Sequence, residues 1–440
     1  MSTAMAELTV TEGERTTAEP TAAGPRTAAE VPGTPLPLDG IKIVDFTQVF
    51  MGPSCTQLLG DYGADIIKVE RPGAGDISRN SFPDQDGQDN PIFLSINRNK
   101  RSVSVDTRTE EGRNVLHVLL ADADVVVSNF RSGVMERMGF GYDELKAENP
   151  GIIWASGTGF GPVGPYSHKG GQDAIAQAYS GVMWRRESEE QKPSIYPTTL
   201  CDYITGMHLM QGILLALRTR ETSGVGQKVE VTMYDSMLHL QMQEACMQLN
   251  RGYEVNWGAM PLSGVFETTD GAVCMVGGFT PDPLARISEA LGLGEDLTQR
   301  PEFANLEQQF QHKPALQAIF RERIATNSTE YWTGRLEDQG LLNAPVHTLE
   351  QALADAQTEA NGMIVEAEHP GVGTVRMLNA PIRLSATPPT VRRVAPRLGE
   401  HNVEVLLENG FDAETIERRS SWGSCGDGCC RTVRPGSRRR

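Results

Sequence analysis

Apolar and polar segments alternate along the first part of the chain in a regular strand–helix order. The segment 38–47 carries its apolar residues in one short run, which predicts a buried strand. A helix should follow, because Pro53 suits a first turn and glycines stand at its expected end. A second apolar run over 65–70 then predicts another strand. This order of strand, helix and strand predicts a βαβ unit.

The alternation continues for about another hundred residues. Strands are predicted over 101–106, 124–130 and 151–161, with helices over 109–123 and around 142–149 between them. Such an order favours a parallel sheet that is covered by helices on both faces. Ligands of these sheets bind beyond the carboxyl ends of the strands. The residues expected there are Thr47 to Met51, Arg71, Asp106 to Arg108, Asn129 to Arg131 and Gly157 to Gly161.

A change of character along the chain predicts an α/β protein with a large and a small domain. Both ends lack periodicity and are poor in apolar residues, so they should stay disordered. After a long apolar helix over 205–227, short strands and helices replace the βαβ order. The predicted segments are a leader (1–35), the first part of a large Rossmann-like α/β domain (36–225), a connecting helical limb (226–254), a small α+β domain (255–345), a return to the large domain (346–418) and a tail (419–440).

Composition narrows the class of protein. The formal net charge of −17 disfavours nucleic acid as a partner, because phosphate backbones bind basic surfaces. No apolar run approaches the roughly 18 residues that span a bilayer, and the polar start has no signal-peptide core, so we expect a soluble cytoplasmic protein. The cluster of Cys425, Cys429 and Cys430 lacks a partner histidine or a second CxxC pair. We therefore predict no metal site.

Motifs that carry chemistry are sparse. The sequence has no Walker loop, no GxSxG and no HExxH. The glycine-rich segment 157–165 either approaches a ligand closely or only forms turns. Basic residues recur between Lys68 and Arg137, where they could bind a polyphosphate or form a solvated surface.

Asp202 is the strongest single candidate. It stands where an extended segment should become the long apolar helix. A carboxylate there meets free backbone N–H groups and the positive end of the helix dipole, which favour its ionised form. An ordinary helix cap explains the same pattern, so the residues alone leave both interpretations open.

From about Leu38 to Leu407 the chain resembles the class III CoA-transferases, the CaiB/BaiF family. The resemblance rests on many ordered segments, among them NRNKRSVSVD, SNFRSGVMERMGFGYDEL and CDYITGMHLMQGILLAL. It implies an enzyme that moves coenzyme A from an acyl-CoA donor to a carboxylic acid acceptor without a permanently bound cofactor. It also implies a homodimer of two interlocked, ring-like subunits, while the net charge and the lack of a long apolar run already predict no nucleic-acid or membrane partner.

The resemblance also implies site residues position by position. Asp202 corresponds to the family's catalytic nucleophile, which passes through an aspartyl anhydride and an aspartyl-CoA thioester. Two arginines would approach the nucleotide phosphates, and Val105 would pack by the adenine. The implied CoA contacts are Val49, Met51, Arg71, Val105, Arg108, Asn129, Phe130 and Arg137.

Three positions bear on which carboxylic acid the enzyme uses as a substrate. The family's oxalate enzymes carry Gln, Trp and Lys where this chain has Phe50, Ser81 and Gly170, and only the neighbouring Lys169 could replace that lysine. Oxalate is therefore disfavoured. Phe50 makes this part of the pocket less polar, which favours a larger or less polar acid.

The fold that the resemblance implies also occurs in α-methylacyl-CoA racemases, which place a histidine before an aspartate. This chain has Gln172 before Asp173, and glutamine cannot act as a general base. The two residues either orient a helix start or pocket wall, or contact the substrate. A CoA-transferase is the leading interpretation, while a racemase or other acyl-CoA enzyme and a non-catalytic CoA-binding protein remain alternatives.

Overall fold

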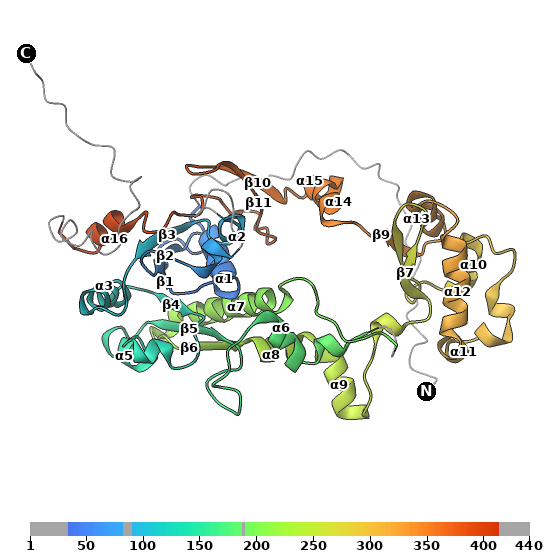
Figure 1. The fold of residues 1–440 in the computed structure, drawn as a ribbon, viewed down its shortest axis with the longest axis horizontal. Helices are drawn as coiled ribbons and strands as arrows, with labels where there is room; N and C mark the ends of the chain where they lie inside the picture. Colours follow the sequence, from blue (N-terminus) through green and yellow to red (C-terminus); the bar gives the residue numbers. More distant parts are fainter. Residues whose placement is uncertain (1–33, 82–89, 187–189, 413–440) are drawn as a thin grey trace, which may run out of the picture.

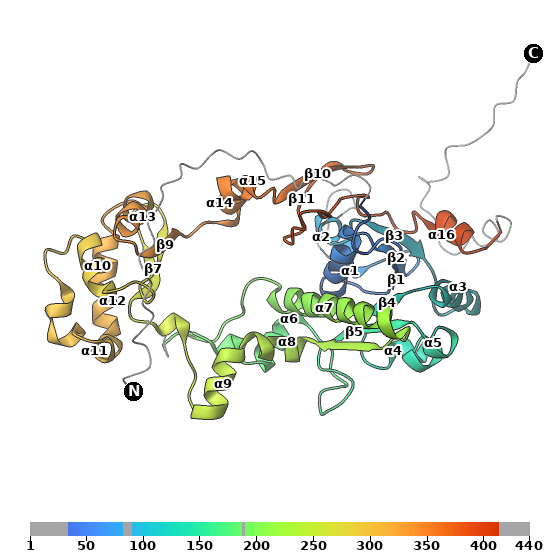
Figure 2. The ribbon, with the colours of Figure 1, turned by 180° about the vertical axis from the view of Figure 1, so that it is seen from behind.

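The computed structural model describes residues 34–81, 90–186 and 190–412, and Figure 1 shows a large and a small lobe. The chain passes between the lobes twice, which gives the ribbon a ring-like outline from either side (Figures 1 and 2). The predicted leader, apart from residues 34 and 35, lies outside the described residues. The predicted tail lies outside them as well, and with it Cys425, Cys429 and Cys430.

The large lobe is built on six parallel strands in the order β3-β2-β1-β4-β5-β6. This confirms the expected α/β fold class with a Rossmann-like parallel sheet. The strand order reverses between β1 and β4, and in such sheets the crevice beyond that point receives the ligand. The strands are β1 (Lys42–Asp45), β2 (Asp65–Glu70), β3 (Lys100–Ser104), β4 (Val125–Ser128), β5 (Ile153–Thr158) and β6 (Lys228–Thr232).

Helices cover both faces of this sheet. Successive strand residues point to opposite faces, so Ile43 joins one apolar cluster and Val44 the other. The first cluster is completed by α1 (Met51–Asp61), α6 (Asp173–Tyr179), α7 (Leu200–Ser223) and α8 (Met233–Leu240). The second is completed by α3 (Glu110–Ala121), α4 (Val134–Arg137), α5 (Tyr142–Glu148) and α16 (Asn402–Glu408).

The helix α7 corrects one expectation. It is long and apolar enough to cross a membrane by length and composition alone, although no such run was expected. In the structure it packs against α1, β5 and β6 as a core helix. A side chain at Gly206 would place its Cβ 2.5 Å from the carbonyl oxygen of Met51, so this glycine allows α7 to lie close to the start of α1. The helix ends at Gly224, whose φ of 68° suits glycine.

The small lobe has its own core around Phe266, Phe320 and Trp332. Its antiparallel sheet has the order β7-β8-β9, which confirms the expected α+β character. The elements are β7 (Ser263–Glu267), β8 (Ala272–Val276), α10 (Pro283–Ala290), α11 (Leu306–Gln311), α12 (Lys313–Ile324), α13 (Thr329–Asp338) and β9 (Leu342–Pro345).

The connections between the lobes contain further elements. The segment 226–254, expected to be a connecting helical limb, begins with β6, which joins the large sheet, and its two helices are separated at Gln241. On the way back, β11 packs by Val375 against the cluster of Phe93. These elements are α9 (Met242–Arg251), α14 (Leu349–Ala354), α15 (Ala356–Ala360) and the hairpin of β10 (Ile364–His369) and β11 (Gly373–Leu378). Phe93 itself belongs to α2 (Pro91–Ser95) of the large lobe.

Candidate active site

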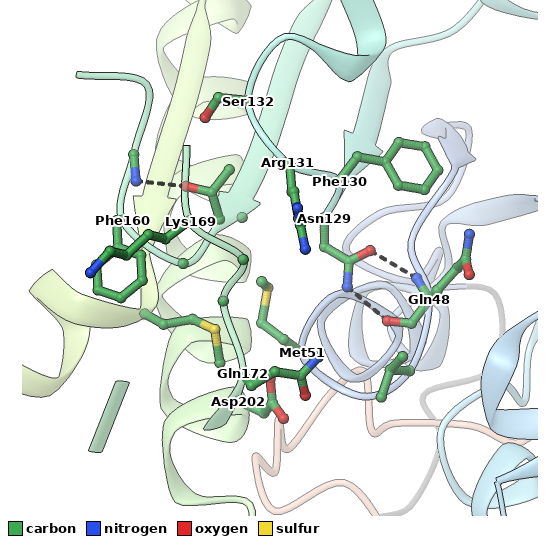
Figure 3. Close-up of a pocket in the computed structure, with 18 of the residues that line it drawn as sticks. Gln48, Met51, Asn129, Phe130, Arg131, Ser132, Phe160, Lys169, Gln172 and Asp202 are labelled. Atoms are coloured by element: carbon green, nitrogen blue, oxygen red, sulfur yellow. Dashed lines mark hydrogen bonds between the residues drawn. The ribbon is translucent and has the colours of Figure 1, made fainter. Parts of the chain in front are cut away.

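A cavity of about 500 Å³ opens at the carboxyl ends of β1, β4 and β5, where the strand order reverses. Loops that follow these strands form much of its wall, and the starts of α6 and α7 complete it (Figure 3). Seven of the residues that the resemblance brought forward as catalytic, CoA-binding or pocket residues line this cavity. They are Val49, Phe50, Met51, Asn129, Phe130, Gln172 and Asp202.

Asp202 is the third residue of α7 and is half-buried. It lies close to Gln172 and Met51 in the view of Figure 3. No residue in the described part of the chain forms a hydrogen bond with its carboxylate. Burial, together with the negative charge of Asp173, raises the pKa of Asp202 to about 7. A half-buried carboxylate without a protein partner is available to react with a ligand in the cavity.

Asp173 caps the helix that carries Asp202. Its Oδ2 accepts hydrogen bonds from the backbone N–H groups of Cys201 (2.8 Å) and Asp202 (3.0 Å). Thr199, at the N-cap position of α7, gives no side-chain hydrogen bond to the helix. The expectation that Asp202 itself meets the free N–H groups and is kept ionised by them is therefore wrong. Asp173 occupies those donors, and its charge opposes ionisation of Asp202.

The capping carboxylate is itself fixed by Gln177 on α6. The amide Nε2 of Gln177 donates to Asp173 Oδ1 at 2.5 Å, and its Oε1 accepts the backbone N–H of Tyr196 at 2.9 Å. Because Gln177 is fully buried, this chain of contacts ties the segment before α7 to α6. Asp173 thus orients the helix start, as one of the two interpretations of the Gln172–Asp173 pair held, while Gln172 lines the cavity.

The loop between β1 and α1 adopts an unusual backbone conformation at the cavity wall. Val49 has a φ of 70°, which is sterically costly for a β-branched residue. Its N–H donates to Asp76 Oδ1 at 3.0 Å. The side chain of Asn129 holds the preceding residue, because it accepts the N–H of Gln48 (2.9 Å) and donates to its carbonyl oxygen (2.7 Å). Two side chains from other parts of the chain therefore hold this loop.

A buried ion pair lies behind the loop. Lys68 Nζ is 2.8 Å from Asp76 Oδ2, and neither side chain is exposed. Burial alone would raise the pKa of Asp76, but the adjacent ammonium and the N–H donors of Val49 and Ser78 together outweigh burial and lower this pKa to about 2. Lys68 also donates to the carbonyl oxygen of Thr47 at 2.8 Å. Sequence reasoning missed Asp76, because its contact with the loop after β1 comes from Val49, which is 27 positions away along the chain.

Four predicted CoA contacts do not line the cavity. Arg71 directly follows β2 and is exposed, and exposed Arg137 ends α4 beyond β4. Arg108 is exposed after β3 and pairs with Asp106 at 2.7 Å. Val105 is buried in the core of the lobe. Since the strands are parallel, all four lie at the same edge of the sheet as the cavity.

The glycine-rich segment 157–165 forms turns and also lines the cavity. Residues 157–161 contribute to the wall, and a Cβ at Gly159 would lie 2.5 Å from the Cα of Gly171. Only glycines allow the loop after β5 to pack this closely on the loop before α6. Ser81, by contrast, does not line the cavity.

Comparison with known proteins agrees with this site and fold. The family model described as CoA-transferase family III matches residues 38–402. The chain therefore belongs to CoA-transferase family III. Membership of this family confirms the resemblance found in the sequence and shows that the protein is a class III CoA-transferase enzyme.

Several family III members are similar over most of their length. An acyl-CoA transferase of Fusarium pseudograminearum is 36% identical over 397 residues, which cover 87% of this chain and 86% of the relative. The succinyl-CoA:glutarate CoA-transferase of Mus musculus is 33% identical, with 87% and 88% covered. The crystal structure of a CaiB/BaiF family protein from Brucella suis matches with a TM-score of 0.77 and 31% identity, over 86% of this chain and 100% of that one.

The buried pair behind the loop yields a prediction about stability and binding. We expect Asp76→Asn to lower the free energy of unfolding by about 3–5 kcal/mol, because it leaves the buried Lys68 charge unpaired. Asp76→Ala, which also removes the acceptor of the Val49 N–H, should in addition raise the KM for acyl-CoA. Thermal unfolding and initial rates measure the two effects.

Glu295→Gln provides the control for this variant. It removes a carboxylate from the exposed Glu295–Arg300 pair, which has a similar distance of 2.6 Å, and exposed pairs contribute little. Equal losses of stability in both variants would contradict the role assigned to the buried pair.

Proposed function

We propose that Asp202 is the covalent nucleophile through which this enzyme transfers coenzyme A between carboxylic acids. The observation that carries the proposal is the position of its carboxylate, which faces the cavity without a protein partner on a helix start that Asp173 holds. A fixed carboxylate divides the exchange into easier covalent steps, because the donor and acceptor acids need never meet.

The steps balance without ATP or a cofactor. The ionised Asp202 attacks the donor thioester carbonyl, which forms a mixed anhydride and releases CoA thiolate. The thiolate attacks the Asp202 carbonyl, so an aspartyl-CoA thioester forms and the donor acid leaves. The acceptor carboxylate attacks this thioester, and CoA thiolate then attacks the acceptor carbonyl of the new anhydride. The products are the acceptor acyl-CoA and free Asp202, and each step conserves the activated acyl bond.

The sheet edge offers a path for a long ligand such as acyl-CoA. The thioester would lie in the cavity, where Val49, Met51, Asn129 and Phe130 form its wall. The nucleotide would extend past the ends of β2 and β3, where exposed Arg71 and Arg108 could pair with its phosphates. Arg137, beyond β4, lies at the same edge.

Gln172 supports the transferase over a racemase, since this cavity-lining residue cannot exchange a proton. Phe50, Met51 and Met233 make part of the wall apolar. An acceptor larger or less polar than oxalate fits this lining.

Labelling tests the covalent role. An acceptor acid with heavy oxygen in its carboxylate should leave one heavy oxygen on Asp202 after a turnover, because the final thiolate attack breaks the anhydride at the acceptor carbonyl. Peptide mass spectrometry measures the label in a mixture of enzyme, acyl-CoA donor and a panel of acids. We expect Asp202→Asn to abolish transfer and aspartyl-CoA formation. Transfer without label on Asp202 would contradict the proposal.

The raised pKa of Asp202 predicts the pH dependence. The nucleophile must be ionised, so kcat/KM should rise with pH through about 7 and then level off. Asp173→Asn removes the neighbouring negative charge but keeps a capping side chain, so the midpoint should move to lower pH. Asp338→Asn, in the small lobe, serves as the control with an unchanged midpoint. A profile that falls through neutrality, or an unshifted midpoint in Asp173→Asn, would count against this assignment.

We also infer that the enzyme is a homodimer of interlocked subunits. The ribbon has a ring-like outline (Figure 2). The helix α9 has no buried residue, and its apolar side chains Leu249 and Met242 are 84% and 54% exposed. A second copy that passes through the ring would cover this helix.

The dimer predicts a mass of two chains in light scattering at micromolar concentration. Leu249→Glu should weaken the dimer, because it places a charge in the apolar contact. Leu306→Glu, on exposed α11 of the small lobe, is the control. A monomer mass for the unaltered protein would refute the inference.

A further inference from the structure

The cavity contains a cation that none of the steps above uses. Arg131 follows β4 and lines the cavity. Figure 3 shows its side chain directed into the cavity from the side opposite Asp202. The residue is exposed, and its guanidinium has no ion-pair or hydrogen-bond partner in the part of the chain that the structure describes. An unpaired guanidinium in a ligand cavity offers paired donors that match a carboxylate.

Gly170 makes room for this guanidinium. A Cβ built at Gly170 would lie 2.7 Å from Arg131 Nη2 and 3.2 Å from its Cζ. The guanidinium therefore occupies the space that a side chain at residue 170 would take. The positive group at this wall comes from the loop after β4, and a side chain at residue 170 would displace it.

The neighbouring Lys169 is held differently. Its ammonium lies over the ring of Tyr166 at 4.3 Å and over that of Tyr179 at 4.8 Å, and it donates to the Tyr179 hydroxyl at 2.5 Å. These contacts engage the ammonium at the aromatic side of the cavity. Of the two neighbouring cations, Arg131 is thus the one without a protein partner.

We propose that Arg131 determines acceptor specificity by binding a second carboxylate, carried by the acid whose first carboxylate reacts at Asp202. The proposal rests on the proposed CoA transfer. The two anionic ends would be bound from opposite sides of the cavity (Figure 3), and the apolar lining that includes Met51 suits the carbon chain between them. The acceptor class is an aliphatic dicarboxylic acid.

Matched acids test the proposal. Succinate, glutarate and adipate are compared with butyrate, pentanoate and hexanoate as acceptors, with an acyl-CoA donor that lacks a second carboxylate. We expect the unaltered enzyme to show a higher kcat/KM for at least one dicarboxylate than for the monocarboxylate of the same chain length. Arg131→Gln should reduce that preference about ten- to a hundredfold, the range for a charged hydrogen bond, while monocarboxylate transfer changes little.

Two further variants separate charge from packing. Gly170→Ala keeps Arg131 but displaces its guanidinium, so it should reduce the same ratio. Lys169→Gln removes a cation from the same cavity and should leave the ratio close to its original value.

The possible failures can be told apart. A wild-type enzyme without a preference for any dicarboxylate would overturn the proposal. An Arg131→Gln variant whose KM for acyl-CoA rises equally with every acceptor would also overturn it, because Arg131 would then bind CoA. Transfer to monocarboxylates would still support the proposed function in both cases. Only the absence of transfer to every acid would contradict the function itself.

Discussion

The ion pair between Lys68 and Asp76 is the contact on which the geometry of the cavity depends. Two unexposed charges cost free energy unless each is matched, and here the match extends to the backbone at Thr47 and Val49. The loop between β1 and α1 thereby keeps Val49 in a left-handed backbone conformation that an unconstrained valine would avoid. Because this loop lies where the strand order reverses, the pair positions one wall of the cavity.

The division of labour between Asp173 and Asp202 is a second constraint. A helix start presents backbone donors that a carboxylate readily occupies, and a nucleophile bound to them would be less reactive. Asp173 takes the donors of Cys201 and Asp202 from a different helix. Asp202 is then held by its backbone while its side chain faces the cavity. Its pKa of about 7, raised by burial and by Asp173, means that the ionised form is reached near neutrality.

The sequence predicted those parts of the structure that local patterns determine. The predicted strands of the large sheet formed, and most of them are short apolar runs flanked by turn residues, although β3 (KRSVS) is mainly polar. The glycine at 224 ended the long helix. Asp202 could be placed at a helix start, and the loops after β1 and β4 at the ligand edge. The roles of Asp76, Asp173 and Gly170 could not be read in this way, because each depends on a partner that only the folded chain brings near.

Charge pairing distinguishes the site from the rest of the large lobe. The lobe buries several charged side chains, and those beneath the cavity are matched, as in the pairs Asp45–Lys100 and Glu70–Arg79. Such pairing is what a stable interior requires. Half-buried Asp202 departs from it, because it lines the cavity and has no protein partner for its charge among the described residues, and the exposed Arg131 lines the same cavity without one. Two unmatched charges of opposite sign across one cavity are best explained by a ligand that interacts with both of them. An acid with two carboxylates would do so, because one carboxylate would react at Asp202 and the other would bind to Arg131.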